Sequence, residues 1–201
     1  MIIDARCSRR TLFAALAGTL LMPCPGWAQQ FEVKRIAEKK VPHLPAGPLF
    51  WRIENFSTLA EAQAAAGPTA LAAESAGKAW LFTLGPKGGS TPGGTKVAEV
   101  GPVPPFSAPE YLLRINTGGG PPGAKTRVHT HPGAETFYVL TGDLSQQTPS
   151  GTSHVTAGQS MPGHAPGTPM QVSSSGSSNL TALVMFVADA TKPFSSPATM
   201  P

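Results

Sequence analysis

Residues 123–142 read Gly123-Ala-Lys-Thr-Arg-Val-His129-Thr-His131-Pro-Gly-Ala-Glu135-Thr-Phe-Tyr-Val-Leu-Thr-Gly142. Successive side chains of a β-strand point to opposite faces, so His129 and His131 face the same way. Pro132-Gly133 supplies turn chemistry, and the returning chain can place Glu135 on the same side. Two imidazoles and one carboxylate form a ligand set that suits non-haem iron, manganese or a similar divalent ion. The sequence therefore predicts a metal site built by a single β-hairpin.

The spacing of this hairpin is more specific than its His-x-His pair, which also occurs in strands that bind nothing. Five positions are fixed together as Gly-x5-His-x-His-x3-Glu-x6-Gly, a pattern that chance would produce in about one in ten thousand chains of this size. The pattern resembles the first motif of the cupin superfamily at every position. The resemblance covers roughly residues 111–189 and implies an antiparallel β-barrel of the jelly-roll type that holds a metal ion.

The second motif of the same family, Gly-x5-Pro-x-Gly-x2-His-x3-Asn, is altered in this chain. The family's histidine in this motif is a fourth metal ligand. If residues 166–169 form the family's turn, Met170 takes that position, whereas His164 lies six residues earlier and is the alternative ligand. We favour Met170, because the Pro-Gly-x-Pro turn fixes the register better than the loop before it. A thioether favours copper over hard cations, and methionine also serves as an apolar wall residue. The remaining histidines, His43 and His154, are expected to face solvent.

The expected ligand set of His129, His131, Glu135 and Met170 leaves coordination positions open on a divalent ion, as catalytic sites do. The expected cofactor is an Fe, Mn or Cu ion. The resemblance to quercetin-dioxygenase-like cupins implies a metal-dependent oxidoreductase for a small organic substrate, with Glu135 as the catalytic residue that also moves a proton. A non-catalytic periplasmic cupin that binds a metal or a small ligand is the alternative, and isomerase or hydrolase chemistry is a third, because a fold does not fix a reaction.

Phe137 and Val139 share the face of Glu135 by strand alternation. They are expected either to line an apolar pocket beside the metal or to fill the barrel core.

The first 28 residues have the organisation of an export signal. A basic segment precedes a short apolar run at 12–22, which is too short to span a bilayer, and small residues lead to a cleavage site after Ala28. Arg9-Arg10 and their neighbours resemble a twin-arginine signal, which predicts a bacterial protein that folds before export to the periplasm or the exterior. An ordinary Sec signal and a lipoprotein signal ending at Cys24 are the alternatives.

Cleavage after residue 28 would leave 173 of the 201 residues, enough for one domain with a sizeable core. Both cysteines, Cys7 and Cys24, would leave with the signal, so no disulfide framework is expected. The net charge would fall from +4 to +2, because three arginines and one aspartate are removed. The four remaining arginines are scattered, so a nucleic-acid partner is not expected. The expected partners are a small-molecule substrate or ligand and a second copy of the chain, since homodimers are common in the family, with no membrane partner after signal removal.

The predicted fold is all-β, a cupin-type antiparallel barrel with an N-terminal extension that carries short helices. Short strand patterns separated by turn signals follow one another from Lys125 onward. Two alanine-rich segments, 58–66 and 69–76, are expected to be the helices. The expected divisions are a signal peptide (1–28), a linker or mobile arm (29–47), an N-terminal elaboration packed on the barrel (48–110), the barrel (111–190) and a C-terminal tail (191–201).

Overall fold

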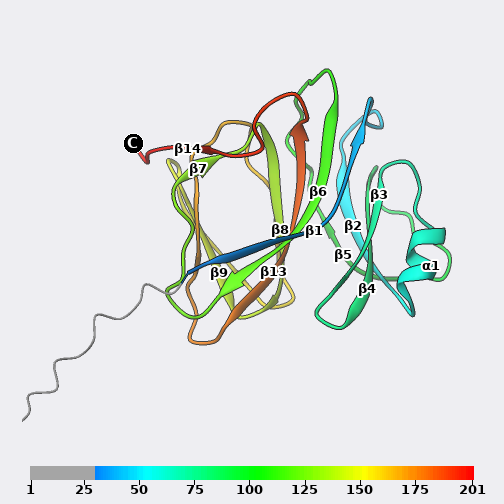
Figure 1. The fold of residues 1–201 in the computed structure, drawn as a ribbon, viewed down its shortest axis with the longest axis horizontal. Helices are drawn as coiled ribbons and strands as arrows, with labels where there is room; N and C mark the ends of the chain where they lie inside the picture. Colours follow the sequence, from blue (N-terminus) through cyan, green and yellow to red (C-terminus); the bar gives the residue numbers. More distant parts are fainter. Residues whose placement is uncertain (1–29) are drawn as a thin grey trace, which may run out of the picture.

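The structure is a computed structural model of the chain, and it describes residues 30–201. The signal peptide predicted over residues 1–28 lies outside the described residues. Within residues 30–201 the chain is almost entirely antiparallel β-structure with one short helix (Figure 1), which confirms the expected fold class. Over the same range no helix has the length and apolar character needed to cross a membrane. The elements are β1 (Glu32–Val41), β2 (Phe50–Phe56), α1 (Leu59–Ala64), β3 (Ala70–Ser75), β4 (Lys78–Gly85), β5 (Thr95–Val100), β6 (Tyr111–Gly120), β7 (His129–Thr130), β8 (Gly133–Thr141), β9 (Asp143–Thr148), β10 (Gly151–Thr156), β11 (Ser160–Met161), β12 (Gln171–Ser174), β13 (Leu180–Asp189) and β14 (Ser196–Pro197).

Two facing sheets form the barrel (Figure 1). The larger sheet has the strand order β1-β6-β13-β8-β11, and the smaller has the order β10-β9-β12. The chain before β7 extends the smaller sheet, because the backbone N–H groups of Thr126 and His129 donate to the carbonyls of Val172 and Met170. β14 then pairs with β7. β8 instead pairs with β13 and β11 of the larger sheet. Residues 123–142 therefore cross from one sheet to the other, and β7 and β8 do not pair as the predicted hairpin.

The motif glycines at the two ends of residues 123–142 have backbone conformations that suit glycine. Gly123 has a φ of +84° and Gly142 a φ of +73°, in the left-handed region that other residues rarely adopt. A β-carbon on Gly142 would also lie only 2.8 Å from the carbonyl oxygen of Asn179. The turn between β8 and β9 therefore requires glycine, which gives the last position of the motif a physical cause.

A third layer covers the outer face of the larger barrel sheet. It is the four-stranded sheet β3-β4-β2-β5, which lies on the right in Figure 1. In β13, Ala182, Val184 and Phe186 point into the barrel, whereas Leu183 and Met185 pack against the third layer. Because both faces of β13 are buried, its sequence is a nearly continuous apolar run instead of an alternating one. The outer core also contains Trp51, Ile53, Leu71, Trp80, Phe82, Leu84, Leu113, Ile115 and Val187.

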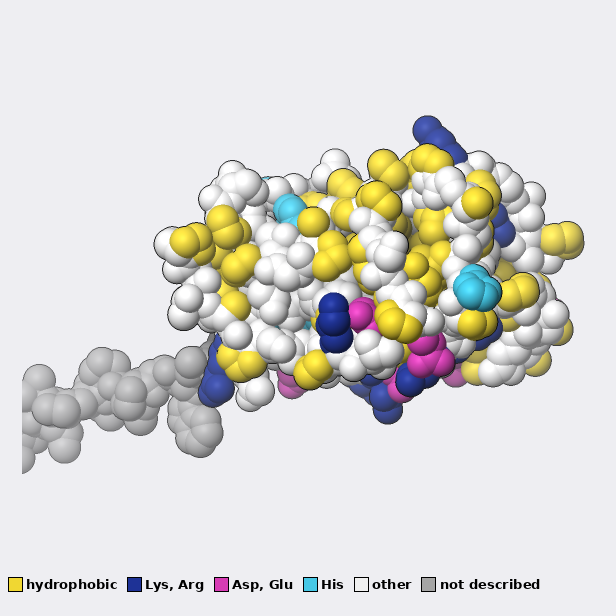
Figure 2. All heavy atoms as spheres, turned by 90° about the horizontal axis from the view of Figure 1, so that it is seen from above, with side chains coloured by type: hydrophobic (Ala, Val, Ile, Leu, Met, Phe, Trp, Pro, Cys, Tyr) yellow, Lys and Arg dark blue, Asp and Glu magenta, His cyan; other side chains and the backbone are white. Residues whose placement is uncertain are grey.

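The segment predicted to be a linker or mobile arm contains a long strand instead. β1 pairs antiparallel with β6 from Glu32 to Val41, with one irregularity between Arg35 and Ala37. β1 is an edge strand, and it carries exposed ion pairs such as that of Arg35 with Glu38. Basic and acidic side chains gather along the lower edge of the view in Figure 2. A charged sequence is typical of both linkers and protected edge strands, because charge discourages pairing with another chain. This ambiguity explains the error.

The second predicted helix, 69–76, is also wrong. These residues form β3, which pairs with β4 through a tight turn at Ala76-Gly77. Ala76 and Gly77 have φ values of 50° and 69°, as a two-residue hairpin turn of type I′ requires. Ala70, Leu71 and Ala73 of β3 are buried, and this tertiary burial outweighs the helical preference of alanine. The first alanine-rich segment is helical as expected, and Thr58 caps it by accepting a hydrogen bond from the N–H of Glu61 (3.2 Å).

Candidate metal centre

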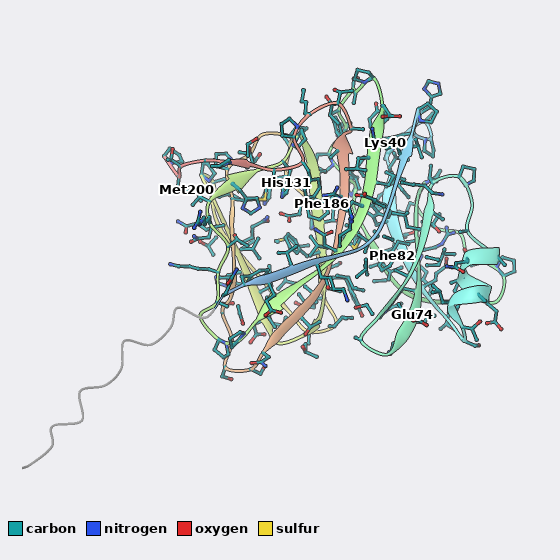
Figure 3. The ribbon with its side chains drawn as sticks, in the orientation of Figure 1. Lys40, Glu74, Phe82, His131, Phe186 and Met200 are labelled. Atoms are coloured by element: carbon teal, nitrogen blue, oxygen red, sulfur yellow. The ribbon has the colours of Figure 1, made fainter. Side chains whose placement is uncertain are left out.

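The structure brings the three motif side chains together inside the barrel. His129 lies in β7, His131 follows it, and Glu135 lies in β8 beyond the Pro132-Gly133 turn. One ligand atom from each of these residues lies within 4.8 Å of those of the other two. Figure 3 shows His131 close to Phe186 of β13 in the barrel, and their ring centroids are 4.9 Å apart. The predicted convergence of two imidazoles and a carboxyl is therefore present, in a group that could bind a metal ion.

Both histidines are oriented by backbone carbonyls. The Nδ1–H of His129 donates to the carbonyl of Arg127 (2.8 Å), and the Nδ1–H of His131 donates to the carbonyl of Phe194 (2.7 Å). A carbonyl can only accept, so each ring carries a proton on Nδ1, and Nε2 is the nitrogen left to face the site. Metal-binding histidines are usually held in this way by a partner on the other nitrogen. The two Nε2 atoms are thus prepared for a cation.

Burial sets the protonation of His131 and Glu135. It lowers the pKa of His131 to about 4, so this imidazole is neutral at neutral pH. It raises the pKa of the Glu135 carboxyl to about 8, so this group keeps its proton at neutral pH when no cation is bound. Both imidazoles lie close to the Glu135 carboxyl: Nε2 of His131 is 3.8 Å from Oε1, and a ring nitrogen of His129 is within 4.8 Å of a carboxyl oxygen. A buried carboxyl beside two imidazoles fits a divalent cation.

Gln146 of β9 connects the group to the residues of the altered second motif. Its Nε2–H₂ donates to Oε2 of Glu135 (3.3 Å) and to Sδ of Met170 (3.2 Å). Its Oε1 accepts from Nε2–H of His164 (2.9 Å). Gln146 was not among the residues predicted for the site. Strand alternation places it on the same inward face as Leu144, so a polar residue at an interior position was the signal that could have found it.

Met170 and His164, the two candidates for a fourth ligand, occupy different positions around Gln146. Met170 is 1% exposed and exchanges both backbone hydrogen bonds with His129, at 2.8 and 3.0 Å. Residues paired in this way point to the same face of a sheet, so Met170 lies beside His129 in the barrel. His164 is only half-buried, on the loop before the turn, and its ring bonds to Gln146. His43 and His154 are exposed, as expected.

The segment predicted to be a C-terminal tail forms part of the site. Besides accepting from His131, Phe194 places its ring 4.8 Å from the His131 ring and 4.9 Å from that of Phe186. The guanidinium of Arg114 lies 3.8 Å from the centre of the Phe194 ring, and Glu38 of β1 holds Arg114 through an ion pair of 2.7 Å. Sequence spacing could not reveal this contact, because Phe194 lies 63 residues after the histidine that it orients.

A cavity of about 690 Å³ opens beside the three donor residues. Phe137 lines this cavity, which was one of the two expectations for that residue. Val139 instead belongs to the barrel core, which was the other expectation. The cavity walls come from both sheets and from the C-terminal segment. Its further lining residues include Phe31, Val33, Asn116, Thr126, Val172, Val184, Phe186, Phe194 and Pro197.

The chain is similar to several solved structures, in each case over less than half of its own length. A DMSP lyase from Ruegeria pomeroyi is 20% identical, with a TM-score of 0.38 over 43% of this chain and 43% of that chain. A cupin-like protein from Thermotoga maritima is 16% identical, with a TM-score of 0.39 over 44% of this chain and 65% of that chain. An oxalate oxidase structure is 20% identical, with a TM-score of 0.36 over 42% of this chain and 45% of that chain.

The chain therefore spans less than half of the length of the lyase and of the oxidase. No protein-family model and no curated protein sequence matches it. The barrel and the group of His129, His131 and Glu135 inside it are features of this structure itself and do not rest on these matches.

Replacement of Glu135 by glutamine is expected to stabilise the metal-free protein at neutral pH. A carboxyl whose folded pKa is raised loses its contribution to stability as the pH rises from about 4.5 to about 8. Glu135→Gln removes this loss, which amounts to on the order of 3 kcal/mol at pH 7. Urea unfolding between pH 4.5 and 8 measures the free energy of unfolding. Glu74→Gln, on the exposed side of β3, is the control. Equal pH dependence of the unfolding free energy in wild type and in Glu135→Gln would contradict the raised pKa of Glu135.

Proposed function

We propose that this chain is an exported metal-binding cupin that acts as a metal-dependent oxidoreductase on a small, largely apolar organic molecule. One observation carries the proposal: His129, His131 and Glu135 place three donor atoms within 4.8 Å of one another, at the wall of a 690 Å³ cavity with mostly apolar side chains. Catalytic metal sites combine such an incomplete ligand set with an adjacent pocket, whereas structural sites are closed by protein ligands.

The donor types favour iron, manganese or copper. Two imidazoles and one carboxylate form the facial set typical of non-haem iron, and they leave positions open for substrate. Met170 lies beside His129, and its sulfur adds a soft donor that favours copper. In the metal-free state this sulfur accepts a hydrogen bond from Gln146, so Met170 can serve as a wall residue or, after a small movement, as a weak fourth ligand.

The ion would supply a centre at which dioxygen and an organic substrate can react side by side. The protein contributes position, proton transfer and exclusion of water. Glu135 carries a proton in its buried, metal-free state and releases it when a cation takes its place. Gln146 holds Oε2 of Glu135 and thereby fixes the direction of its other oxygen. Phe137, Phe186 and Phe194 form an aromatic wall that can hold an apolar substrate and displace water from it.

Export to the bacterial periplasm is part of the proposal and rests on the amino-terminal sequence with its Arg9-Arg10 pair. Folding before export would let the cytoplasm supply the metal. The protein would then avoid competition in the periplasm from copper and zinc, whose affinities for such ligands are higher.

Metal content distinguishes the ligands from their neighbours. In protein purified from its own periplasm, His129→Ala and His131→Ala are expected to lower the metal-to-protein ratio at least ten-fold, because each removes one of three donors. His154→Ala, which changes an exposed histidine, is the matched control. Elemental analysis of each variant names the ion and measures its stoichiometry.

The same measurement ranks the two candidates for the fourth position. Met170→Leu keeps the side-chain volume and is expected to lower metal affinity by a few-fold at most, whereas His164→Ala should retain the wild-type ratio. Loss of metal from His164→Ala to the extent seen in His129→Ala would show that His164 is the fourth ligand.

Truncation after Lys192 is expected to weaken metal binding by 10- to 100-fold, because it removes the Phe194 carbonyl that orients His131. Truncation after Ala198 is the control, since it keeps Phe194 and the backbone bond from Ala198 to Val128. Phe194→Leu keeps the carbonyl and should lose much less affinity. Competition against a fluorescent chelator measures the dissociation constants. Similar affinities in both truncated proteins would contradict a role for the C-terminal segment.

Oxygen consumption tests the oxidoreductase proposal directly. The metal-reconstituted protein is expected to consume dioxygen with at least one member of a panel of phenols and diketones, and His129→Ala should consume none. An oxygen electrode records the rate, and calorimetry on the same samples records binding. If the metal-loaded protein binds these compounds without oxygen uptake, the chain is a periplasmic binding cupin and the proposed reaction is wrong.

A further inference from the structure

We infer that the cavity beside the metal centre selects an elongated apolar ligand that carries a hydroxyl group at the end away from the metal, and that Asn116 binds this hydroxyl. The inference rests on the proposed function for the role of the metal at the other end of the ligand. It is argued from the side-chain carbonyl of Asn116 in the cavity wall, which has no hydrogen-bond partner in the described part of the chain and which neither the metal motif nor the barrel core explains.

Asn116 lies on the inner face of β6. Its neighbours two residues away, Arg114 and Gly118, share this face, whereas Leu113 and Ile115 pack against the third layer. Asn116 is 3% exposed and lines the cavity that also contains His129, His131 and Glu135. Its side chain therefore belongs to the wall of the metal-containing cavity and has almost no access to bulk solvent.

The side-chain carbonyl of Asn116 has no hydrogen-bond partner within residues 30–201. Leaving a buried polar group without a partner is destabilising, and most such groups in folded proteins are satisfied. The positions on either side in the sheet, Val184 of β13 and Arg35 of β1, offer this carbonyl no hydrogen bond. An apolar residue would suit this interior position better if only the fold were at stake. The amide is thus free for a ligand.

A hydroxyl is the group that fits this amide best. The carbonyl accepts a hydrogen bond, and if the amide is turned over its NH₂ group donates one instead. A hydroxyl can both donate and accept, so it pairs with Asn116 in either orientation. A carboxylate could only accept and would bring a second buried negative charge towards Glu135, at a large cost in desolvation.

The sheet order sets the length of the ligand. β13 lies between β6, which carries Asn116, and β8, which carries Glu135. Two strand spacings, about 10 Å, separate these strands, and the register places Asn116 level with Phe137, so Asn116 and Glu135 are about 12 Å apart along the sheet. The surface between them is formed by Val184 and Phe186 of β13, and Phe137 adds a further apolar wall. A ligand that reaches from the metal centre to Asn116 therefore needs a rigid apolar body of about the length of two fused rings.

A pair of probes isolates the contact: 2,6-dihydroxynaphthalene carries a hydroxyl at both ends, and 2-naphthol carries only one. Zinc-loaded protein is used, because zinc has no redox chemistry and leaves the probes intact. In wild type the second hydroxyl is expected to tighten binding roughly three- to ten-fold, the range of one hydrogen bond. In Asn116→Leu this gain should disappear while the affinity for 2-naphthol stays within two-fold. Calorimetry measures both constants.

Two controls keep the result specific. Ser195→Ala removes another polar group from the cavity lining and should leave the gain intact. Asn116→Leu should also be at least as resistant to heat as wild type, because it removes an unpaired polar group. If leucine does not fit, Asn116→Ala takes its place in the same comparison.

The outcomes separate this inference from the proposed function. An equal gain from the second hydroxyl in wild type and in Asn116→Leu would overturn the inference, as would failure of both probes to bind. Marked destabilisation by both Asn116 variants would also overturn it, since it would give the amide a structural role. Persistence of the Asn116-dependent gain in metal-free protein would support the hydroxyl site even if the metal proposal failed.

Discussion

The burial of one β-sheet on both of its faces is the constraint on which the rest of this structure depends. The central strands β6, β13 and β8 lie between the barrel interior and a second, four-stranded sheet. Their outward side chains, such as Leu183 and Met185, form a wide apolar contact, and the buried hydroxyl of Thr136 is satisfied by donating to the carbonyl of Met185. The side chains on the inward face of the same strands include Glu135 and Asn116, which line the cavity. The apolar contact with the four-stranded sheet thus supports the strands whose inner face lines the cavity.

The metal centre shows what it costs to bury a titratable group and which hydrogen bonds the fold provides around it. A carboxyl buried with no strong positive partner keeps its proton, and its pKa rises to about 8. The surrounding groups are satisfied one by one: each histidine donates to a backbone carbonyl, and Gln146 bonds to Glu135, Met170 and His164. The unpaired amide of Asn116 departs from this rule. Local costs of this kind are expected where a protein binds something else.

The site draws on segments that are far apart in the chain. The edge strand β1 contributes Glu38, which holds Arg114, and Arg114 lies over the ring of Phe194. Phe194 in turn fixes the tautomer of His131. The predicted arm and the predicted tail are therefore joined at the metal centre, and the polar residues of β1 serve both edge protection and the support of the site.

The local sequence determined the two glycine turns and the meeting of His129, His131 and Glu135, because strand alternation and turn chemistry act over a few residues. The all-β barrel followed from the same motif and from the short strands after it. Tertiary structure alone decided that residues 70–75 pair as a strand, that β1 joins the barrel sheet, and that Gln146, Asn116 and Phe194 surround the site. These outcomes depend on which distant surfaces bury one another, and alanine-rich or charged segments leave that choice to the contacts of the whole fold.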